Sequence, residues 1–583
     1  MVIKKIIHTF AKEFKKKKKK TMATQTKTTQ RNAFVDAMNF KPMTLTENGA
    51  MAFSSTGSAI VDQFGKAGNF RGRSVAEVFA DQAAIWNENA EAAIRFPFYL
   101  RMITRKVKVN GDNETDKVQN GQGARDESFK RLLWVAVNHS DVFYKNIWAL
   151  PLVGSWKDLW TILFYDKKEN INVLDHKAMF EVIANGLACE THVDLVKKFM
   201  PRIKSKSKCT TDWTRITNDF AKEFANFMGI TYKEYNKLKT SGKAHDFQKI
   251  ICAREYDKLN WNRIPGRALN LLVTSKFLKN HDLSEKYTEW IMEQPVAKFT
   301  GYVFELARKA REAAHTSSYY NMCRIPTKIP TEVKHTLDAQ FMGLVEKARK
   351  DGKITDNVLV ALDTSGSMGH GVDGLNGVCC GDIATSLALF FSELNEGAFH
   401  HKIMMFDNTS YPFDFKSDSF CDNLMSLPGV PSGGTNFQSV IDEIVKIRKQ
   451  YPQIPLEEYP NTILVVSDMQ FNPTGNWWNR NPRQQECNLE FAKETLCEVF
   501  PKEFVDNIKF IWWDCASRKQ TFEGSAFEAG ITFLSGFDGS IINTLMGMEK
   551  VLDEKTGEYR NPTAEELVMK ALSQEILNYI TLA

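Results

Sequence analysis

The chain has 583 residues, of which 43% are hydrophobic and 25% are charged, and its formal net charge is +6. This length is too great for one hydrophobic core, so two or more domains are expected, and the mild charge excludes a general electrostatic attraction to nucleic acid. The ten cysteines form no CxxC pair, which argues against a disulfide framework and predicts reduced thiols in a cytoplasmic protein. No apolar run approaches the roughly 20 residues that would span a bilayer, so no transmembrane segment is expected.

Residues 1–43 open with the basic, weakly amphipathic stretch MVIKKIIHTFAKEFKKKKKKTM. Such a stretch is typical of a solvated extension, or of an upstream translation start that precedes a true start at Met22. Contact with a membrane surface or with RNA is the alternative interpretation. The stretch lacks the small-residue cleavage site of a secretory signal, so residues 1–43 are predicted to form a basic disordered tail outside the fold.

From about Ser74 to Arg349 the apolar residues recur mostly at helical spacing. Segments 74–103, 126–148, 155–166 and 212–230 show this pattern, and several open with Ser or Asp as an N-cap. Short polar turns separate successive helices, although no strict repeat period is visible. The pattern predicts a stacked array of helices.

From residue 357 onwards, strands alternate with helices. Continuous apolar runs, typical of strands buried on both faces, lie at 357–363, 400–407, 461–469, 507–515 and 531–537, with helical stretches such as 382–396 and 437–451 between them. This alternation predicts a doubly wound α/β domain over residues 357–547, so the fold class is α plus α/β. Ligands bind at the carboxyl ends of the strands in such sheets, where Asp363, Asp407 and Asp468 are expected.

Residues 548–583 are predicted to form a C-terminal helical segment. Asn561 and Pro562 stand where a helix over 561–580 would begin. We expect this helix to pack onto one of the two domains.

Oxygen donors gather in three separate loops of the α/β domain. The stretches DTSGS, SGGTN and SDM contain Asp363, Ser365, Ser367, Thr435 and Asp468. Hard oxygen ligands without histidine or cysteine favour Mg²⁺ or a similar hard divalent cation over zinc. Because hydroxyl ligands are neutral, the ion would keep much of its charge and attract an acidic oxygen of a partner. A serine-rich turn without metal and a purely structural ion are the alternatives.

These three stretches, in this order, resemble the metal-ion-dependent adhesion site of von Willebrand factor A domains, which bind ligands through Mg²⁺. Nearly the whole chain from about Thr44 resembles the TROVE-related domain of unknown function 2828, a distant relative of the Ro autoantigen proteins. The stretches LTENGAMAFSSTGSAIVDQFGKAG, LPLVGSWKDLWTIL, NWNRIPGRALNLL, SDMQFN and SGFDGSIINTLMG carry this resemblance. It implies that HEAT-like helical repeats over 44–349 form a ring or clamp, which a von Willebrand A domain closes. It also implies binding of small noncoding RNA.

Two features depart from that family. The loop GHGVDGLNGVCCGD after Met368 is long and rich in glycine, and Asp514 stands where the family suggests an asparagine. The first departure predicts a different rim around the metal site. The second adds a carboxylate near the strand ends, although an exposed aspartate at a strand terminus is the simpler interpretation.

Three basic segments of the helical region are candidates for contact with small noncoding or single-stranded RNA. Lysine and arginine neutralise phosphates, and the nearby Trp213 and Trp261 could stack on unpaired bases. Solvated lysine loops and core tryptophans are the alternative interpretation. The candidate residues are Arg101, Arg105, Lys106, Lys108, Arg202, Lys204, Lys206, Lys208, Arg263 and Arg267.

The sequence favours binding over catalysis. It contains neither the GxxxxGK[ST] phosphate loop nor HExxH, and the hydroxyl-rich cluster does not match a two-metal nuclease, which needs several direct carboxylates. His370, His400 and His401 are interpreted as surface residues rather than general bases. The leading hypothesis is a non-enzymatic RNA-binding scaffold of the Ro-like kind. The alternative is a protein-interaction module that holds an acidic partner residue through the metal, without RNA.

Overall fold

The computed structural model describes residues 43–103, 105–107, 117–242, 246–315, 328–351, 354, 356–427, 433–473, 488–516, 521–539, 541, 550–553 and 557–582. The basic tail predicted over residues 1–43 therefore lies outside the described residues, except for Met43, which begins a strand. No helix of the described part is both long and apolar enough to cross a bilayer.

The region before residue 351 is an array of helices, as predicted from its apolar spacing. Ser74 begins one of them with a capping box, since its hydroxyl accepts from the Glu77 N–H and its own N–H donates to the Glu77 carboxylate. Asn89 separates two helices where the sequence suggested one segment, and its side chain caps the second. The helices are α3 (Ala59–Phe64), α4 (Val75–Glu88), α5 (Ala90–Arg101), α6 (Arg125–Asn138), α7 (Ser140–Asn146), α8 (Leu150–Val153), α9 (Lys157–Lys168), α10 (His176–Ala188), α11 (Val193–Phe199), α12 (Asp212–Phe227), α13 (Tyr232–Thr240), α14 (Asp246–Ala253), α15 (Gly266–Thr274), α16 (Phe277–Asn280), α17 (Ser284–Met292), α18 (Val303–Ala313) and α19 (Thr331–Asp351).

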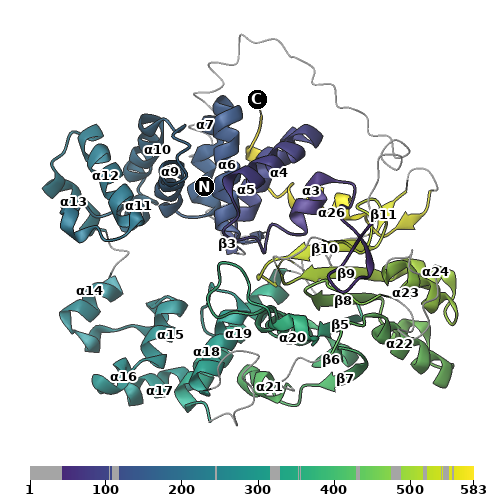
Figure 1. The fold of residues 1–583 in the computed structure, drawn as a ribbon. Coiled ribbons are helices and arrows are strands. Elements are labelled where there is room, and N and C mark those ends of the chain that lie inside the picture. Colours follow the sequence, from purple (N-terminus) through teal and green to yellow (C-terminus); the bar gives the residue numbers. More distant parts are fainter. Residues whose placement is uncertain are drawn as a thin grey trace.

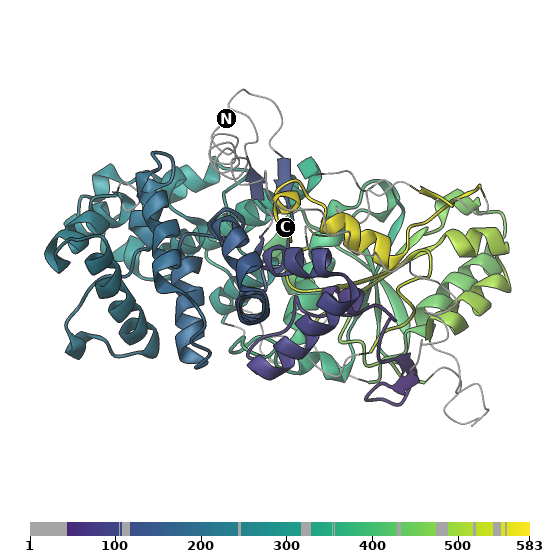
Figure 2. The ribbon, with the colours of Figure 1, turned by 90° about the horizontal axis from the view of Figure 1, so that it is seen from above.

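Both ends of the array contact the α/β domain. At its start, α3 packs on the strand β10 (Ile531–Ser535) and on α26 (Ala564–Ala571). At its end, α18 and α19 pack on α20 (Cys380–Leu394). Figure 1 shows one row of helices leading from the sheet out to α13 and a second row returning from α14 to α19, and the view from above shows the sheet and the outermost helices at opposite ends of the molecule (Figure 2). The predicted ring or clamp is therefore closed by the α/β domain.

A six-stranded sheet forms the centre of the α/β domain, and its strand order is β10-β9-β8-β5-β6-β7. The strands β5 (Val358–Asp363), β8 (Thr462–Ser467) and β10 are buried along their whole length, which explains their continuous apolar runs. All neighbours are parallel except β6 (Lys402–Phe406) and β7 (Ser410–Asp414). The chain order reverses between β5 and β8, which makes their carboxyl ends the place where ligands bind in sheets of this kind. This domain also contains β9 (Lys509–Asp514), α21 (Phe420–Ser426), α22 (Gln438–Gln450), α23 (Asn488–Cys497) and α24 (Lys502–Asn507).

The first described residues belong with the sheet rather than with the helices. A hairpin of β1 (Met43–Leu45) and β2 (Met51–Phe53) is followed by a segment that reaches the carboxyl ends of the strands. Thr46 donates to the carbonyl of Phe471 over 2.7 Å, and Phe53 exchanges backbone hydrogen bonds of 2.8 Å with Phe522. Gly68 passes so close to β10 that a Cβ there would lie 2.6 Å from the carbonyl oxygen of Ser535. This contact explains why a glycine is needed in the FGKAG stretch.

The C-terminal helix is shorter than the predicted 561–580. Thr563 is the N-cap of α26, with Glu566 completing a capping box. The two preceding residues are held outside the helix, because the Asn561 side chain donates to Asn507 and the carbonyl of Pro562 accepts from Gly530. The segment contacts both domains rather than one: α26 lies on β10 and α3, and the N–H of Thr581 donates to Asn146 over 3.1 Å.

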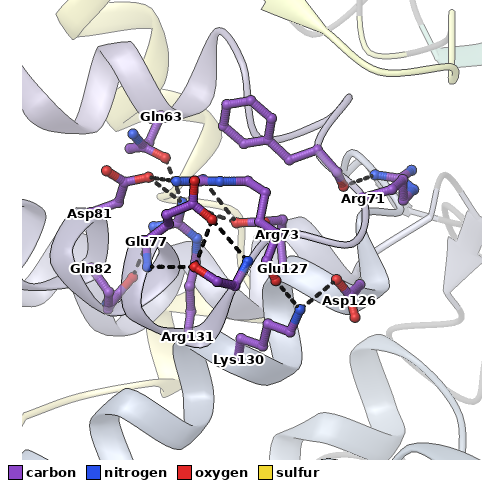
Figure 3. A network of polar contacts seen from close by, with 12 residues as sticks. Gln63, Arg71, Arg73, Glu77, Asp81, Gln82, Asp126, Glu127, Lys130 and Arg131 are labelled. Carbon is purple, nitrogen blue, oxygen red and sulfur yellow. Dashed lines mark hydrogen bonds and ion pairs between the residues drawn. The ribbon is translucent and has the colours of Figure 1, made fainter. Parts of the chain in front are cut away.

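A buried polar network joins the first helices of the array. Figure 3 shows Arg131 and Glu127 of α6 meeting Gln63 of α3 and Gln82 of α4. The Arg131 guanidinium donates to Gln63 over 2.5 Å and to Glu127 over 3.3 Å, and both side chains of this ion pair have no exposed surface. Burial raises the pKa of Glu127 although Arg131 and Arg73 oppose this shift. The network fixes the orientation of α3, α4 and α6 at the start of the array, where α3 contacts the α/β domain.

Candidate functional site

The three loops predicted to supply metal ligands meet at the carboxyl ends of β5 and β8. Asp363 is the last residue of β5, and Ser367 lies in the 3₁₀ turn η7 (Gly366–Gly369) that follows. Thr435 precedes α22, and Asp468 follows β8 directly. Backbone hydrogen bonds join the loops, from Gly366 to the carbonyl of Gly433 over 3.3 Å and from Asn472 to the carbonyl of Thr435 over 2.8 Å. The position is the one that the reversal of strand order favours.

Hydrogen bonds orient the side chains of the first loop, Asp363, Ser365 and Ser367. One carboxylate oxygen of Asp363 accepts from the Ser365 N–H over 2.8 Å, and the other accepts from the Ser467 hydroxyl. The hydroxyls of Ser365 and Ser367 lie 3.1 Å apart. The alternation of Asp363, Ser365 and Ser367 therefore brings their oxygens to one side of the turn, as expected for residues that leave a strand.

The site concentrates negative charge away from water. Asp363, Thr435 and Asp468 are each at most 1% exposed. Burial, and next the negative charge of Asp468, raise the pKa of Asp363 to about 7. Two buried carboxyl groups so close together are unfavourable when both are ionised, and a divalent cation between them would remove that cost.

The residues present fit a hard divalent cation. The Thr435 hydroxyl oxygen is buried, and within the described part of the chain it has no hydrogen-bond partner. A buried hydroxyl without a partner is unfavourable unless a ligand completes it. Together with the carboxylates of Asp363 and Asp468 and the serine hydroxyls, it forms a donor set of oxygen atoms, which Mg²⁺ prefers. Asp407, also expected near this edge, instead accepts from the N–H of Thr409 in its own turn.

Two residues beside the site were not identified from the sequence. Ser467 holds Asp363 through its hydroxyl and also accepts from the Met469 N–H over 3.0 Å. Gln470 donates its N–H to Asp468 and accepts from Glu47 of the N-terminal hairpin over 2.7 Å. Ser467 was visible in the SDM stretch as the residue before the predicted ligand. Gln470 gave no signal, because its partner is 423 positions away.

Asp514, at the end of β9, is a half-buried group rather than an exposed strand terminus. Burial raises its pKa to about 8, while the Ala516 N–H and the Lys66 ammonium oppose this shift. Burial lowers the pKa of Lys66 to about 7. Both residues line a small cavity together with Met469 and Glu523, next to the candidate cation site. The extra carboxyl group therefore accepts from the Ala516 N–H over 2.7 Å and lies near a lysine of the N-terminal segment.

Glu523 of this cavity should make the stability of the fold dependent on pH. Glu523 is 2% exposed, and burial raises its pKa to about 8. In the unfolded chain the carboxyl loses its proton near its ordinary pKa of about 4.3, so between these values the folded state holds more protons and stability falls as the pH rises. Glu523→Gln, which keeps the shape without the charge, should therefore become more stable than the wild type as the pH increases from 5 to 8.

Denaturant unfolding at both pH values measures this difference. Glu498→Gln is the matched control, because the Glu498 side chain is 61% exposed and its change should have little effect at either pH. A Glu523→Gln effect that is the same at pH 5 and pH 8 would contradict the assignment of a buried, protonated carboxyl.

The predicted basic residues do not form one surface. Arg101 is partly buried, with 11% of its side chain exposed, and pairs with Asp158 over 2.7 Å, and exposed Arg267 pairs with Glu305 through two hydrogen bonds. Arg263 is exposed. Arg105 and Lys106 lie in β3 (Arg105–Val107), but their side chains and the whole of Lys108 lie outside the described residues.

Four of the exposed predicted cations gather beside α11 and α12. Arg202, Lys204, Lys206 and Lys208 are all exposed, the last two in the 3₁₀ turn η2 (Lys206–Lys208). Burial and the nearby charge of Arg202 lower the pKa of Lys239 on α13, so like charges are held close together. We call these four exposed residues the basic loop. Trp213, by contrast, is half-buried against Phe164 at 5.0 Å between ring centroids, and Trp261 packs on Tyr287 at 5.1 Å, so both belong largely to the core.

Comparisons with known proteins give matches to a family of unknown function, to an uncharacterised protein and to a solved structure. Residues 357–578 match the family described as Domain of unknown function (DUF7788), a different description from that of the family the motifs resemble. The matched range continues past residue 547 to η10 (Leu577–Tyr579). "Uncharacterized protein L728" of Acanthamoeba polyphaga mimivirus is 20% identical over 535 residues, which cover 87% of this chain and 85% of that protein. The crystal structure of the Deinococcus radiodurans RO (RSR) protein is similar with a TM-score of 0.39 at 13% identity, covering 78% of this chain and 88% of that one.

Proposed function

We propose that this protein is a non-enzymatic binding scaffold. It holds Mg²⁺, or a similar hard divalent cation, at the carboxyl edge of its sheet, where the parallel strands end, and it holds RNA on its helical array. The observation that carries the proposal is the meeting, at the ends of β5 and β8, of two carboxyl groups with a buried Thr435 hydroxyl that has no hydrogen-bond partner among the described residues. The free thiols of the described cysteines are consistent with a reducing, cytoplasmic environment.

The chemistry of the donor set suggests a bridging rather than a catalytic ion. Asp363, Ser365, Ser367, Thr435 and Asp468 would hold the cation, as in the adhesion sites of von Willebrand A domains that their pattern resembles. Three of these five groups are neutral hydroxyls, so the ion would retain positive charge for a carboxylate or phosphate of a partner. A two-metal nuclease would need more direct carboxylates than this site contains.

The basic loop supports the RNA part of the proposal. Four cations at 202, 204, 206 and 208 are exposed beside α11 and α12, at the outer end of the first row of helices, far from the sheet (Figure 1). Closely spaced exposed cations attract the phosphate backbone without reading its sequence. We therefore expect RNA contact on the array, away from the cation site.

Protein purified from its host separates this function from the alternative. We expect RNA to be extracted from material purified at low salt and to be lost at high salt, because phosphate contacts are screened. Absence of RNA, together with no binding of single-stranded or hairpin RNA at low salt, would favour a protein-interaction module in which the cation holds an acidic side chain of a partner.

Replacement of Lys204, Lys206 and Lys208 together by alanine should weaken RNA binding for all sequences tested. Each lost phosphate contact should reduce the slope of log K against log salt by about 0.7 for single strands. The protein should fold normally, because the three side chains are exposed. Fluorescence titration of a labelled single strand at several salt concentrations measures the slope.

The matched control removes three exposed lysines of the α/β domain, Lys416, Lys446 and Lys449. This control lowers the net charge by the same amount at a different place. Equal salt slopes for both triple variants would show that the basic loop has no particular role.

A further inference from the structure

Two adjacent histidines and a glutamate meet at the amino edge of the sheet, where the parallel strands begin. Glu393 lies in the last turn of α20, and His400 and His401 directly precede β6. Because Asp407 directly follows the other end of β6, this cluster and the candidate Mg²⁺ site lie at opposite edges of the sheet. The cluster is therefore independent of the site described above.

The three side chains direct possible ligand atoms toward one another. The Nε2 atom of His401 lies 2.7 Å from one carboxylate oxygen of Glu393, and the Nε2 atom of His400 lies 3.6 Å from the other. The two imidazole rings are stacked, with centroids 3.9 Å apart. One ligand atom from each residue lies within 4.8 Å of the other two. Ligands around a tetrahedral Zn²⁺ are roughly 3.3 Å apart, as follows from Zn–N distances of about 2.0–2.1 Å, so small side-chain rotations would complete the site.

The backbone conformation at His401 explains how two adjacent histidines can both face Glu393. Successive side chains of an extended strand point to opposite faces, so two adjacent histidines would normally be separated. His401 instead has a φ of 60°, in the left-handed region that side chains other than glycine rarely adopt. Its N–H donates to Ser392 over 3.0 Å and its carbonyl accepts from Phe415 over 2.9 Å. The turn therefore places both imidazoles on the same side, facing Glu393.

Arg349 of α19 is the charged group that also faces this cluster. Its guanidinium donates to the Glu393 carboxylate over 3.1 Å and to the backbone carbonyl of Glu393. The arginine orients the carboxylate and offsets part of its charge, which leaves the imidazole nitrogens to decide which ion is preferred. Nitrogen donors favour Zn²⁺, Co²⁺ or Ni²⁺ over Mg²⁺. The side chains of His400, His401 and Glu393 are 39%, 15% and 13% exposed, so an ion can reach them from solvent.

We propose that Glu393, His400 and His401 form a binding site for a divalent transition-metal ion such as Zn²⁺. Three protein ligands of this kind leave a position open for water or for an additional ligand. The ion would join the end of α20 to the start of β6. Through Arg349 it would also lie beside α19, the last helix of the array, so metal binding should stabilise the junction between the two domains.

Cobalt provides a direct test with the untagged full chain. Co²⁺ is titrated into chelator-treated protein in the presence of excess Mg²⁺, and its visible absorption is followed, since the intensity of this absorption reports the ligand geometry. We expect saturation at one ion per chain, displacement by Zn²⁺, and an increase in the midpoint of thermal unfolding when Zn²⁺ is added. His400→Ala and His401→Asn should each weaken binding by at least tenfold; asparagine is chosen because it tolerates a positive φ.

The chain contains a matched control. His176 forms a surface pair with Glu223 at 3.0 Å. Among the described residues, no third histidine, cysteine or carboxylate joins this pair to make a cluster of three possible ligands. His176→Ala should leave Co²⁺ binding unchanged. The proposal would be overturned if wild type, His400→Ala and His401→Asn bound Co²⁺ equally, or if binding were lost equally in His176→Ala. Because Asp363 lies at the other edge, Asp363→Ala should retain this binding whatever its effect on Mg²⁺.

Discussion

Asp363→Ala should abolish Mg²⁺ binding, while RNA binding by the helical array is largely retained. Asp363 holds the turn that carries Ser365, and it supplies one of two buried carboxyl groups at the site. Its loss removes charge and preorganisation together, so we expect no measurable Mg²⁺ binding. The Mg²⁺-dependent increase in the midpoint of thermal unfolding, which follows from binding to the folded state, should disappear in the variant.

Thr435→Val is the matched variant for this prediction. Valine has nearly the shape of threonine, and the Thr435 hydroxyl is buried without a hydrogen-bond partner in the described structure. Without metal, this variant should be as stable as the wild type or more stable by about 1 kcal/mol, since a buried unpaired polar group is removed. With Mg²⁺ it should be less stabilised than the wild type. Parallel loss of RNA affinity in folded Asp363→Ala would show instead that both domains form one coupled site.

Arg131→Ala should produce the largest loss of stability among these changes. The Arg131 side chain has no exposed surface and holds Glu127, Gln63 and Gln82 through its guanidinium. Its removal leaves a buried carboxylate whose next cation, Arg73, lies 3.6 Å away. Breaking a buried ion pair in this way costs about 3–5 kcal/mol. Denaturant unfolding followed by tryptophan fluorescence should show this loss in the transition of the helical array.

Arg215→Ala is the control for Arg131. Arg215 also forms an ion pair, with Asp212 at 2.6 Å, but both side chains are more than 60% exposed. Exposed pairs contribute about 0–1 kcal/mol, so this variant should unfold almost as the wild type does. A similar effect of both substitutions would contradict the structural role of the buried network.

The sequence predicted the parts of the fold whose signals are local. Strands such as β5 and β8 are buried on both faces, so each produces a continuous apolar run. The edge strand β7 was missed, because it is partly exposed and contains Pro412, which an edge strand tolerates. The docking of the N-terminal hairpin was also missed. Its contacts, such as Thr46 with Phe471, join residues 425 positions apart, and no local pattern encodes such a pairing.

The candidate site was predictable for a similar reason. Asp363, Ser365 and Ser367 are neighbours in the chain, and the ends of parallel strands bring Asp468 to them. Charge alone was less informative in the helical array, because the sequence does not distinguish a basic residue that pairs with a carboxylate inside the array from an exposed one. Arg101 pairs with Asp158 inside the array, whereas Lys204 is exposed. The cluster of His400 and His401 was likewise interpreted as surface, since the left-handed turn at His401 is not visible in sequence.

Isothermal titration of Mg²⁺ into the full chain, beside Asp363→Ala and Thr435→Val, tests the central claim most directly. We predict that one ion binds per wild-type chain, that Asp363→Ala binds none, and that Thr435→Val binds more weakly while remaining folded. The same Mg²⁺ affinity in all three proteins would contradict the assignment of a cation site to the carboxyl edge of the sheet.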